Sequence, residues 1–240
     1  MVSPQPSSGQ HLEDSMKKIR YILVTFSDVR MRASEIPKLR GYFAQKFPEN
    51  HLFHNHLPGN ALSFKMPLIQ YRIIQGSPAL LGIGEGIDLM KKIFFEIEEL
   101  KIGGDTVTCN EKQISLVEAG FGQSPDFHDY RFVSPWMALN SDNYKEYLAL
   151  NPNERKQQLR KILRGNLLTI SKGFSYTIPD FDSVSVEGWF KPVSRNLHGI
   201  PMNCFTGEFS VNFLIPDQLG LGKQSARGFG VVMNDNKEDR

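Results

Sequence analysis

The sequence LGLGKQSARGFGVV, at residues 219–232, decides how this chain is interpreted. It holds four glycines and two cations, and it lies between apolar stretches at residues 209–215 and 229–233. Glycine has no Cβ, so its backbone can approach a phosphate and point N–H groups at it, while lysine and arginine add positive charge. The segment is typical of a phosphate-binding loop, whose candidate binding residues are Gly220, Gly222, Lys223, Ser225, Arg227, Gly228 and Gly230.

Two nucleotide-binding motifs do not match this segment. A P-loop needs Ser or Thr after Gly-Lys and a further glycine five residues upstream, whereas Gln224 follows Lys223 and position 217 is Asp. A dinucleotide fingerprint needs a following helix and an acidic residue about twenty residues on. Two interpretations remain: a loop that holds a polyphosphate chain such as RNA, or a structural glycine turn.

The rest of the chain repeats one plan twice. In the first half, apolar and β-branched residues predict strands, and apolar residues at helical spacing predict helices. The order is strand 19–26, helix 37–47, strands 68–75 and 79–83, helix 86–95, then strand-like pieces over 97–117. This is the βαββαβ order of a ferredoxin-like domain.

The second half follows the same plan after a predicted linker at residues 120–126. A strand is expected at 130–139, helices over 141–169, and strands at 184–190 and 201–215, with the glycine-rich loop in place of the second helix. The predicted fold class is α+β, with two tandem ferredoxin-like domains at residues 16–122 and 123–233. Residues 1–15 are expected to be disordered, and residues 234–240 to form a loose tail.

Composition places few limits on function. The 240 residues carry a net charge of +2, and 40% of them are hydrophobic, which is enough for real cores. No apolar run has membrane-spanning length and no signal peptide is evident, so the sequence predicts a soluble protein of the cytoplasm. Cys109 and Cys204 lack metal-site spacing and are expected to be small buried residues.

Basic residues cluster in two further places. Residues 17–46 carry eight cations, Arg40 among them, and residues 155–164 carry five: Arg155, Lys156, Arg160, Lys161 and Arg164. Lys156, Arg160 and Arg164 are four residues apart, so they share one helical face. Such a face can simply be solvated, but three basic clusters together favour a polyanion surface. RNA is favoured over duplex DNA because no helix-turn-helix, zinc finger or basic zipper is present.

The histidines are concentrated at His51, His54 and His56. Three interpretations compete: a His-x-x-His-x-His metal site, solvated loop histidines, and general acid–base catalysis. The metal site lacks a nearby cysteine or aspartate. Imidazole titrates near neutrality and RNA supplies its own 2′-hydroxyl nucleophile, so acid–base cleavage would need no metal. His128 and His198 lie in no motif and are expected to be structural or surface residues.

The C-terminal segment resembles the glycine-rich signature of the repeat-associated RNA-binding (RAMP) superfamily of CRISPR systems. The runs KLRGY at 38–42, FHNH at 53–56 and PLIQYR at 67–72 resemble the N-terminal half of its repeat-processing endoribonucleases. The resemblance implies the same two-domain fold, a catalytic histidine after the first helix, and no cofactor. On this basis His54 and His56 are expected to be the catalytic pair, with His51 third, Tyr42 as a helper and Lys46 as a charge stabiliser.

The resemblance also implies the reaction and the partners. The expected activity is metal-independent cleavage of CRISPR repeat RNA in its precursor, which leaves a 2′,3′-cyclic phosphate and a 5′-hydroxyl. The expected partners are this RNA and a CRISPR effector complex, with the protein itself a monomer or homodimer and no membrane involved. The alternative is a non-catalytic RNA-binding subunit of a CRISPR effector complex.

Overall fold

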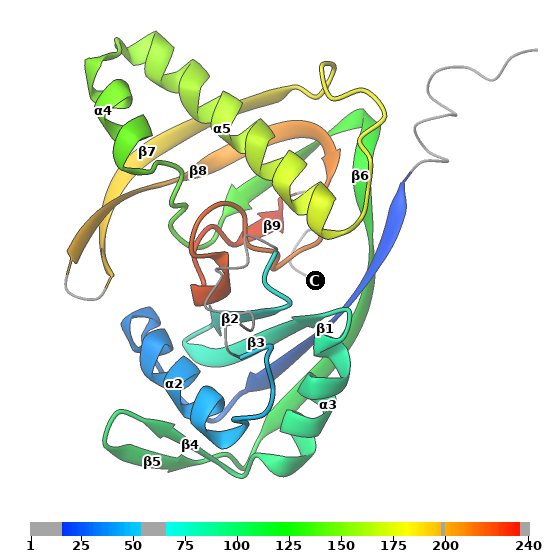
Figure 1. The fold of residues 1–240 in the computed structure, drawn as a ribbon, viewed down its shortest axis with the longest axis vertical. Coiled ribbons are helices and arrows are strands. Elements are labelled where there is room, and N and C mark those ends of the chain that lie inside the picture. Colours follow the sequence, from blue (N-terminus) through cyan, green and yellow to red (C-terminus); the bar gives the residue numbers. More distant parts are fainter. Residues whose placement is uncertain (1–15, 54–65, 198–199, 236–240) are drawn as a thin grey trace, which may run out of the picture. The chain divides into compact units, whose positions relative to one another are not determined.

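The computed structural model describes residues 16–53, 66–197 and 200–235. The chain forms two compact units. The N-terminal unit contains Arg20–Glu118 and Gln224–Gly228, and the C-terminal unit contains Met1–Ile19, Ala119–Lys223 and Phe229–Arg240. The mixed α+β architecture with two sheet-containing units agrees with the predicted fold class (Figure 1).

The N-terminal unit has the predicted order of elements. Its strands and helices are β1(Lys17–Phe26), a 3-10 turn η1(Ala33–Glu35), α2(Ile36–Lys46), β2(Ile69–Ile74), β3(Ser77–Ile83), α3(Gly86–Glu96) and the start of β6(Lys112–Phe132). The strands lie in the order β2-β3-β1-β6, and β3 is antiparallel to both neighbours. A two-residue turn with positive φ at Gln75 and Gly76 closes the β2–β3 hairpin.

The core of this unit is built by α2, α3 and one face of the sheet. Leu39 and Phe43 of α2 and Ile93 of α3 are fully buried, because they recur at helical spacing on the faces turned to the strands. The rings of Phe47 and Phe53 stack on Phe43 and close the end of α2. A small separate sheet, β4(Glu99–Ile102) and β5(Asp105–Thr108), turns at Gly103.

The predicted linker at residues 120–126 is wrong, because these residues lie within β6. Gly122 and Gln123 pair with β8, and a register shift follows before His128. Glycines and a proline in this stretch accompany an irregularity in a long strand. β6 therefore belongs to both units, and the predicted boundary at residue 122 falls inside a strand.

The C-terminal unit continues with α4(Ser141–Ala149), α5(Pro152–Gly173), β7(Val186–Leu197), β8(Ile200–Leu214), a second 3-10 turn η2(Ser225–Arg227) that packs in the other unit, and β9(Val232–Asn234). β8 pairs with both β6 and β7, and β9 pairs with β6. Asn151 caps α5 by accepting hydrogen bonds from the backbone N–H groups of Asn153 and Glu154, each at 3.0 Å. None of the described helices is long and apolar enough to cross a membrane.

The predicted C-terminal tail begins later than expected. Asn234 ends β9, and Asp235 forms an ion pair with Arg131. The remaining tail residues 236–240 and the N-terminal residues 1–15 lie outside the described part of the chain.

Candidate functional site

The glycine-rich segment is divided between the two units. Residues 219–223 and 229–232 belong to the C-terminal unit, whereas Gln224–Gly228 pack within the N-terminal unit. The segment contains the short 3-10 helix η2, which lies beside β2 (Figure 1). Positive φ angles at Gln224 (59°) and Gly228 (81°) bound η2 and turn the chain into and out of it.

Three glycines of the segment are required by the protein's own packing. Gly222, Gly228 and Gly230 all have positive φ, which side chains with a Cβ rarely adopt. A Cβ on Gly222 would lie 2.7 Å from the indole nitrogen of Trp136. A Cβ on Gly228 would lie 3.0 Å from the backbone oxygen of Tyr71. The structural explanation therefore accounts for these three glycines without a phosphate.

Several backbone groups of the segment are also engaged internally. The N–H groups of Leu221, Lys223 and Gly230 donate to the carbonyls of Gly230, Met137 and Pro135 at 2.8, 3.3 and 2.9 Å. Gly220 forms a β-bridge with Val231 and is buried. Ser225 is buried as well, whereas the Lys223 side chain is exposed. These donors are directed into the fold, so the positive charge of the segment comes from its side chains.

Two arginines approach one another in the N-terminal unit. Arg40 of α2 lies over the Tyr71 ring, with its guanidinium carbon 5.9 Å from the ring centroid. Burial lowers the pKa of Arg40, and the nearby positive charge of Arg227 lowers it further. Both side chains are half-buried, and Arg40 forms no ion pair with any carboxylate among the residues that the structure describes. Arginine binds phosphate in a bidentate geometry, so these two side chains are candidate phosphate contacts.

The basic residues of α5 divide into two groups. Arg155 donates to the carbonyls of Tyr147 and Leu148 at 3.0 and 2.8 Å, and Arg164 donates to the carbonyl of Phe181 at 2.7 Å. Arg160 forms an ion pair with Glu187. By contrast, Lys156 and Lys161 are exposed. Three of the five cations of α5 therefore bind the protein itself, and of the three predicted to share one helical face only Lys156 is exposed.

The histidine cluster is only partly described. His51 lies in a turn after α2, is 72% exposed, and has its Nε2 atom 3.8 Å from Glu85 Oε2. Phe53, the residue before His54, is buried against Phe43 and Phe47. His54 and His56 lie outside the described residues, so the metal-site and acid–base interpretations both stay predictions.

The two predicted helpers occupy different environments. Tyr42 is buried, and its hydroxyl donates to the Glu99 carbonyl at 2.7 Å, which joins α2 to β4. Burial raises the pKa of the Tyr42 hydroxyl. This placement gives Tyr42 a packing role, and its role as a catalytic helper stays a prediction. Lys46 is exposed in the last turn of α2.

The residues that were expected to be structural are partly described. His128 Nε2 lies 3.0 Å from Ser124 Oγ at the irregularity of β6, and His198 lies outside the described residues. Cys109 and Cys204 are buried, as predicted. Burial raises the pKa of the Cys109 thiol to about 11, which disfavours its reactive thiolate form.

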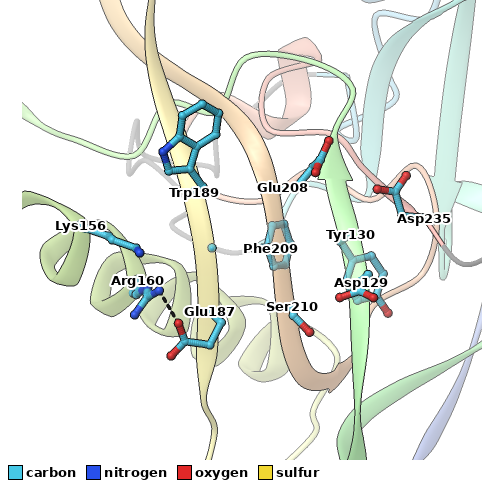
Figure 2. A pocket seen from close by; sticks show the side chains of 11 residues that line it. Asp129, Tyr130, Lys156, Arg160, Glu187, Trp189, Glu208, Phe209, Ser210 and Asp235 are labelled. Carbon is cyan, nitrogen blue, oxygen red and sulfur yellow. Dashed lines mark ion pairs between the residues drawn. The ribbon is translucent and has the colours of Figure 1, made fainter.

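A cavity of about 650 Å³ lies over the sheet of the C-terminal unit. Figure 2 shows its lining, with two cations from α5, an indole from β7, and carboxylates from β6, β7, β8 and the residue after β9. The labelled side chains are Asp129, Tyr130, Lys156, Arg160, Glu187, Trp189, Glu208, Phe209, Ser210 and Asp235. Four carboxylates repel phosphate and outnumber the two cations. This cavity is therefore a poor site for an RNA strand.

One buried polar pair on β2 was not among the predicted site residues. Gln70 and Arg72 are both buried and lie on the strand that η2 contacts. The signal was present in the sequence, since two polar side chains alternate with apolar ones in a strand that is otherwise apolar.

Comparison with known families gives two adjacent matches. The Cas6b N-terminal domain matches residues 17–119, and the Cas6b C-terminal domain matches residues 122–234. Together these matches cover nearly all of the described residues.

Known proteins and solved structures agree with these matches. A crystal structure of Cas6b is 37% identical, with a TM-score of 0.85 over 91% of this chain and 100% of its own. A crystal structure of the CRISPR RNA processing endoribonuclease Cas6b is 32% identical, with a TM-score of 0.73 over the same shares. An uncharacterized protein, MJ0978 of Methanocaldococcus jannaschii, is 35% identical over 144 residues, which are 60% of this chain and 97% of the relative.

Proposed function

Since this chain belongs to the Cas6b family, we propose that it is an endoribonuclease that binds CRISPR repeat RNA and cleaves it within the precursor transcript. A solved Cas6b relative that covers 91% of this chain is described as a CRISPR RNA processing endoribonuclease. The guide RNA product then passes to a CRISPR effector complex, and the enzyme acts as a monomer or a homodimer.

The observation that carries this proposal is the half-buried pair of Arg40 and Arg227 in the N-terminal unit. In the sequence, His54 and His56 follow α2, the helix that carries Arg40. A phosphate between the two guanidiniums relieves their repulsion and accepts bidentate hydrogen bonds from them. In this proposal the two arginines bind the RNA backbone, and the candidate acid and base act on the bound RNA.

The proposed chemistry uses the RNA's own 2′-hydroxyl as the nucleophile. One histidine of the His54–His56 pair removes the 2′-proton as the oxygen attacks the adjacent phosphorus in line. The other histidine donates a proton to the 5′-oxygen as the P–O5′ bond breaks. The products are a 2′,3′-cyclic phosphate and a 5′-hydroxyl, and no divalent metal takes part. His51 is the third candidate, and Lys46, which is exposed, is the candidate that stabilises negative charge.

The test is cleavage of the cognate repeat RNA in excess EDTA, with product ends identified by mass spectrometry. Wild-type protein is expected to produce a single cut with a cyclic-phosphate end. His54→Ala and His56→Ala are each expected to reduce the single-turnover rate by about 100-fold or more while leaving RNA affinity nearly unchanged. His128→Ala is the matched control, because this histidine contacts Ser124 in the other unit.

The outcomes separate the competing interpretations. Tight binding of the repeat RNA without any cut favours a non-catalytic RNA-binding subunit. Cleavage that appears only after divalent metal is added favours the metal-site interpretation of the histidines. Absence of repeat binding contradicts the proposed function altogether.

A further inference from the structure

Strand β2 has two buried faces of different character. Ile69 and Tyr71 point into the hydrophobic core of the N-terminal unit, and Gln70 and Arg72 alternate with them. Arg72 is only 1% exposed. Burial lowers the pKa of its guanidinium to about 9, which expresses the penalty of holding a cation away from water.

The guanidinium of Arg72 connects β2 to the C-terminal glycine-rich segment. Its Nη1 donates to the carbonyl of Tyr71 at 2.7 Å and to the carbonyl of Ser225 at 3.0 Å, and its Nη2 donates to Gln70 Oε1. Gln70 is itself held, because its Nε2 donates to the Pro67 carbonyl at 3.1 Å. The rigid fork of an arginine thus reaches two segments that are 153 residues apart in the chain.

The element held by Arg72 carries Arg227. Ser225 is the first residue of η2 and Arg227 is the last, so the position of the Ser225 carbonyl sets where the Arg227 side chain begins. Gly228 brings the end of η2 close to β2, since a Cβ there would lie 3.0 Å from the backbone oxygen of Tyr71. The glycine allows the close approach, and the guanidinium supplies the hydrogen bond.

We propose that Arg72 is a positioning residue that holds η2 so that Arg227 stands beside Arg40 and faces the RNA. This inference rests on the proposed function. Arg72 is too deeply buried to contact a phosphate, so it acts through Arg227. An apolar side chain would fill this face of β2 without desolvating a cation, so packing alone does not explain an arginine here.

A double-mutant cycle on the full chain tests this role. Affinity for repeat RNA with a 2′-deoxy substitution at the mapped cleavage site is measured at several salt concentrations for wild type, Arg72→Lys, Arg227→Ala and the double variant. Arg72→Lys is expected to weaken binding about 5–10-fold and to lower the salt slope by about 0.7–0.9, the loss of one phosphate contact. In the Arg227→Ala background, Arg72→Lys is expected to change affinity less than about 2-fold.

A merely structural Arg72 gives a different result. An equal loss in both backgrounds, or an unchanged salt slope for Arg72→Lys, overturns the positioning role. Gln70→Met provides a second variant that keeps the cation and removes one of its acceptors. Gln70→Met is expected to lower RNA affinity less than Arg72→Lys does, and only when Arg227 is present. An equal loss of RNA affinity with and without Arg227 overturns the proposal.

The cycle also distinguishes the two proposals from one another. If the wild-type protein binds and cleaves repeat RNA but the effects of the two substitutions are additive, only the positioning role of Arg72 is contradicted. Wild-type protein that does not discriminate repeat RNA from a scrambled RNA contradicts the proposed function, and the inference fails with it. Thermal unfolding of each variant confirms that the compared proteins are folded.

Discussion

Arg40 and Arg227 lie close enough that the charge of Arg227 lowers the pKa of Arg40, in addition to the effect of burial. The two residues come from opposite ends of the chain, one on α2 and one on η2, yet they belong to the same compact unit. Like charges destabilise one another unless an anion lies between them. Arg227 is thus the cation of the glycine-rich segment that lies near a second arginine.

Replacing either arginine should weaken RNA binding mainly through charge. Arg40→Gln and Arg227→Gln are each expected to lower the slope of log affinity against log salt by about 0.7–0.9. Filter binding at several salt concentrations measures this slope. Lys101→Gln is the control, because Lys101 is exposed on β4 and lies 4.0 Å from Glu99. An equal effect of Lys101→Gln would show that the pair has no special role.

Tyr42→Phe distinguishes a packing residue from a catalytic helper. The variant loses the hydrogen bond to the Glu99 carbonyl, so the free energy of unfolding is expected to fall by about 1 kcal/mol. Because the hydroxyl is engaged by the fold, the single-turnover cleavage rate is expected to stay within about 2-fold of wild type. A loss of about 100-fold, typical of a removed acid or base, would instead make Tyr42 catalytic.

Gly228→Ala should damage the contact of η2 with β2. The positive φ and the close Tyr71 oxygen both oppose a Cβ, so we expect the free energy of unfolding to fall by about 1–3 kcal/mol. RNA affinity should fall as well, because Arg227 precedes this glycine. Gly41→Ala is the matched control: it lies within α2 with open space around it, and alanine there is expected to stabilise by about 0.5–1 kcal/mol. Urea unfolding measures the free energy of unfolding of both glycine variants.

The cations of α5 should separate into stabilising and binding residues. Arg155→Ala removes two hydrogen bonds to the carbonyls that end α4, and we expect the free energy of unfolding to fall by about 1.5–3 kcal/mol with RNA affinity unchanged. Lys156→Ala should leave stability unchanged. We expect it to weaken RNA binding about 2-fold, because the exposed Lys156 is a candidate contact to the RNA backbone. Urea unfolding and RNA binding measured on both variants check this separation. A stable Arg155→Ala variant with weakened RNA binding would contradict it.

Tyr130 should contribute to unfolding at alkaline pH. Burial raises its pKa from 10.0 to about 12, and its hydroxyl accepts a hydrogen bond from the Ile215 N–H at 2.9 Å. The folded state therefore retains a proton that the unfolded state releases. Its stability contribution is present below pH 10 and is lost as the pH rises through about 12, by up to about 1.4 kcal/mol per pH unit.

Urea unfolding between pH 9 and pH 12 measures this effect. Tyr130→Phe is expected to show a shallower loss of stability over that range, although the buried Tyr42 and Tyr71 keep some of it. An identical slope in wild type and Tyr130→Phe would show that Tyr130 does not retain its proton.

Element boundaries were predicted best where local periodicity is strong. α2 lies one residue earlier than the predicted helix at both ends, and α3 begins at the predicted residue 86 and ends one residue later than predicted. Apolar residues at helical spacing fix both helices locally. The linker at residues 120–126 failed because glycine and proline signal both hinges and strand irregularities. Only pairing with β8, about 90 residues later in the chain, distinguishes the two.

By itself the sequence determined the element order, the two-part α+β fold, the glycine-rich segment and the resemblance to CRISPR repeat-processing endoribonucleases. These features depend on neighbours within a few turns or strands, where side-chain spacing is fixed by backbone geometry. The tertiary structure alone decided that η2 packs in the N-terminal unit, that Arg72 holds it, and that Arg155, Arg160 and Arg164 bind the protein. Such partners are far apart in the chain, as Arg72 and Ser225 are, and only the closed fold brings their donors and acceptors within hydrogen-bond distance.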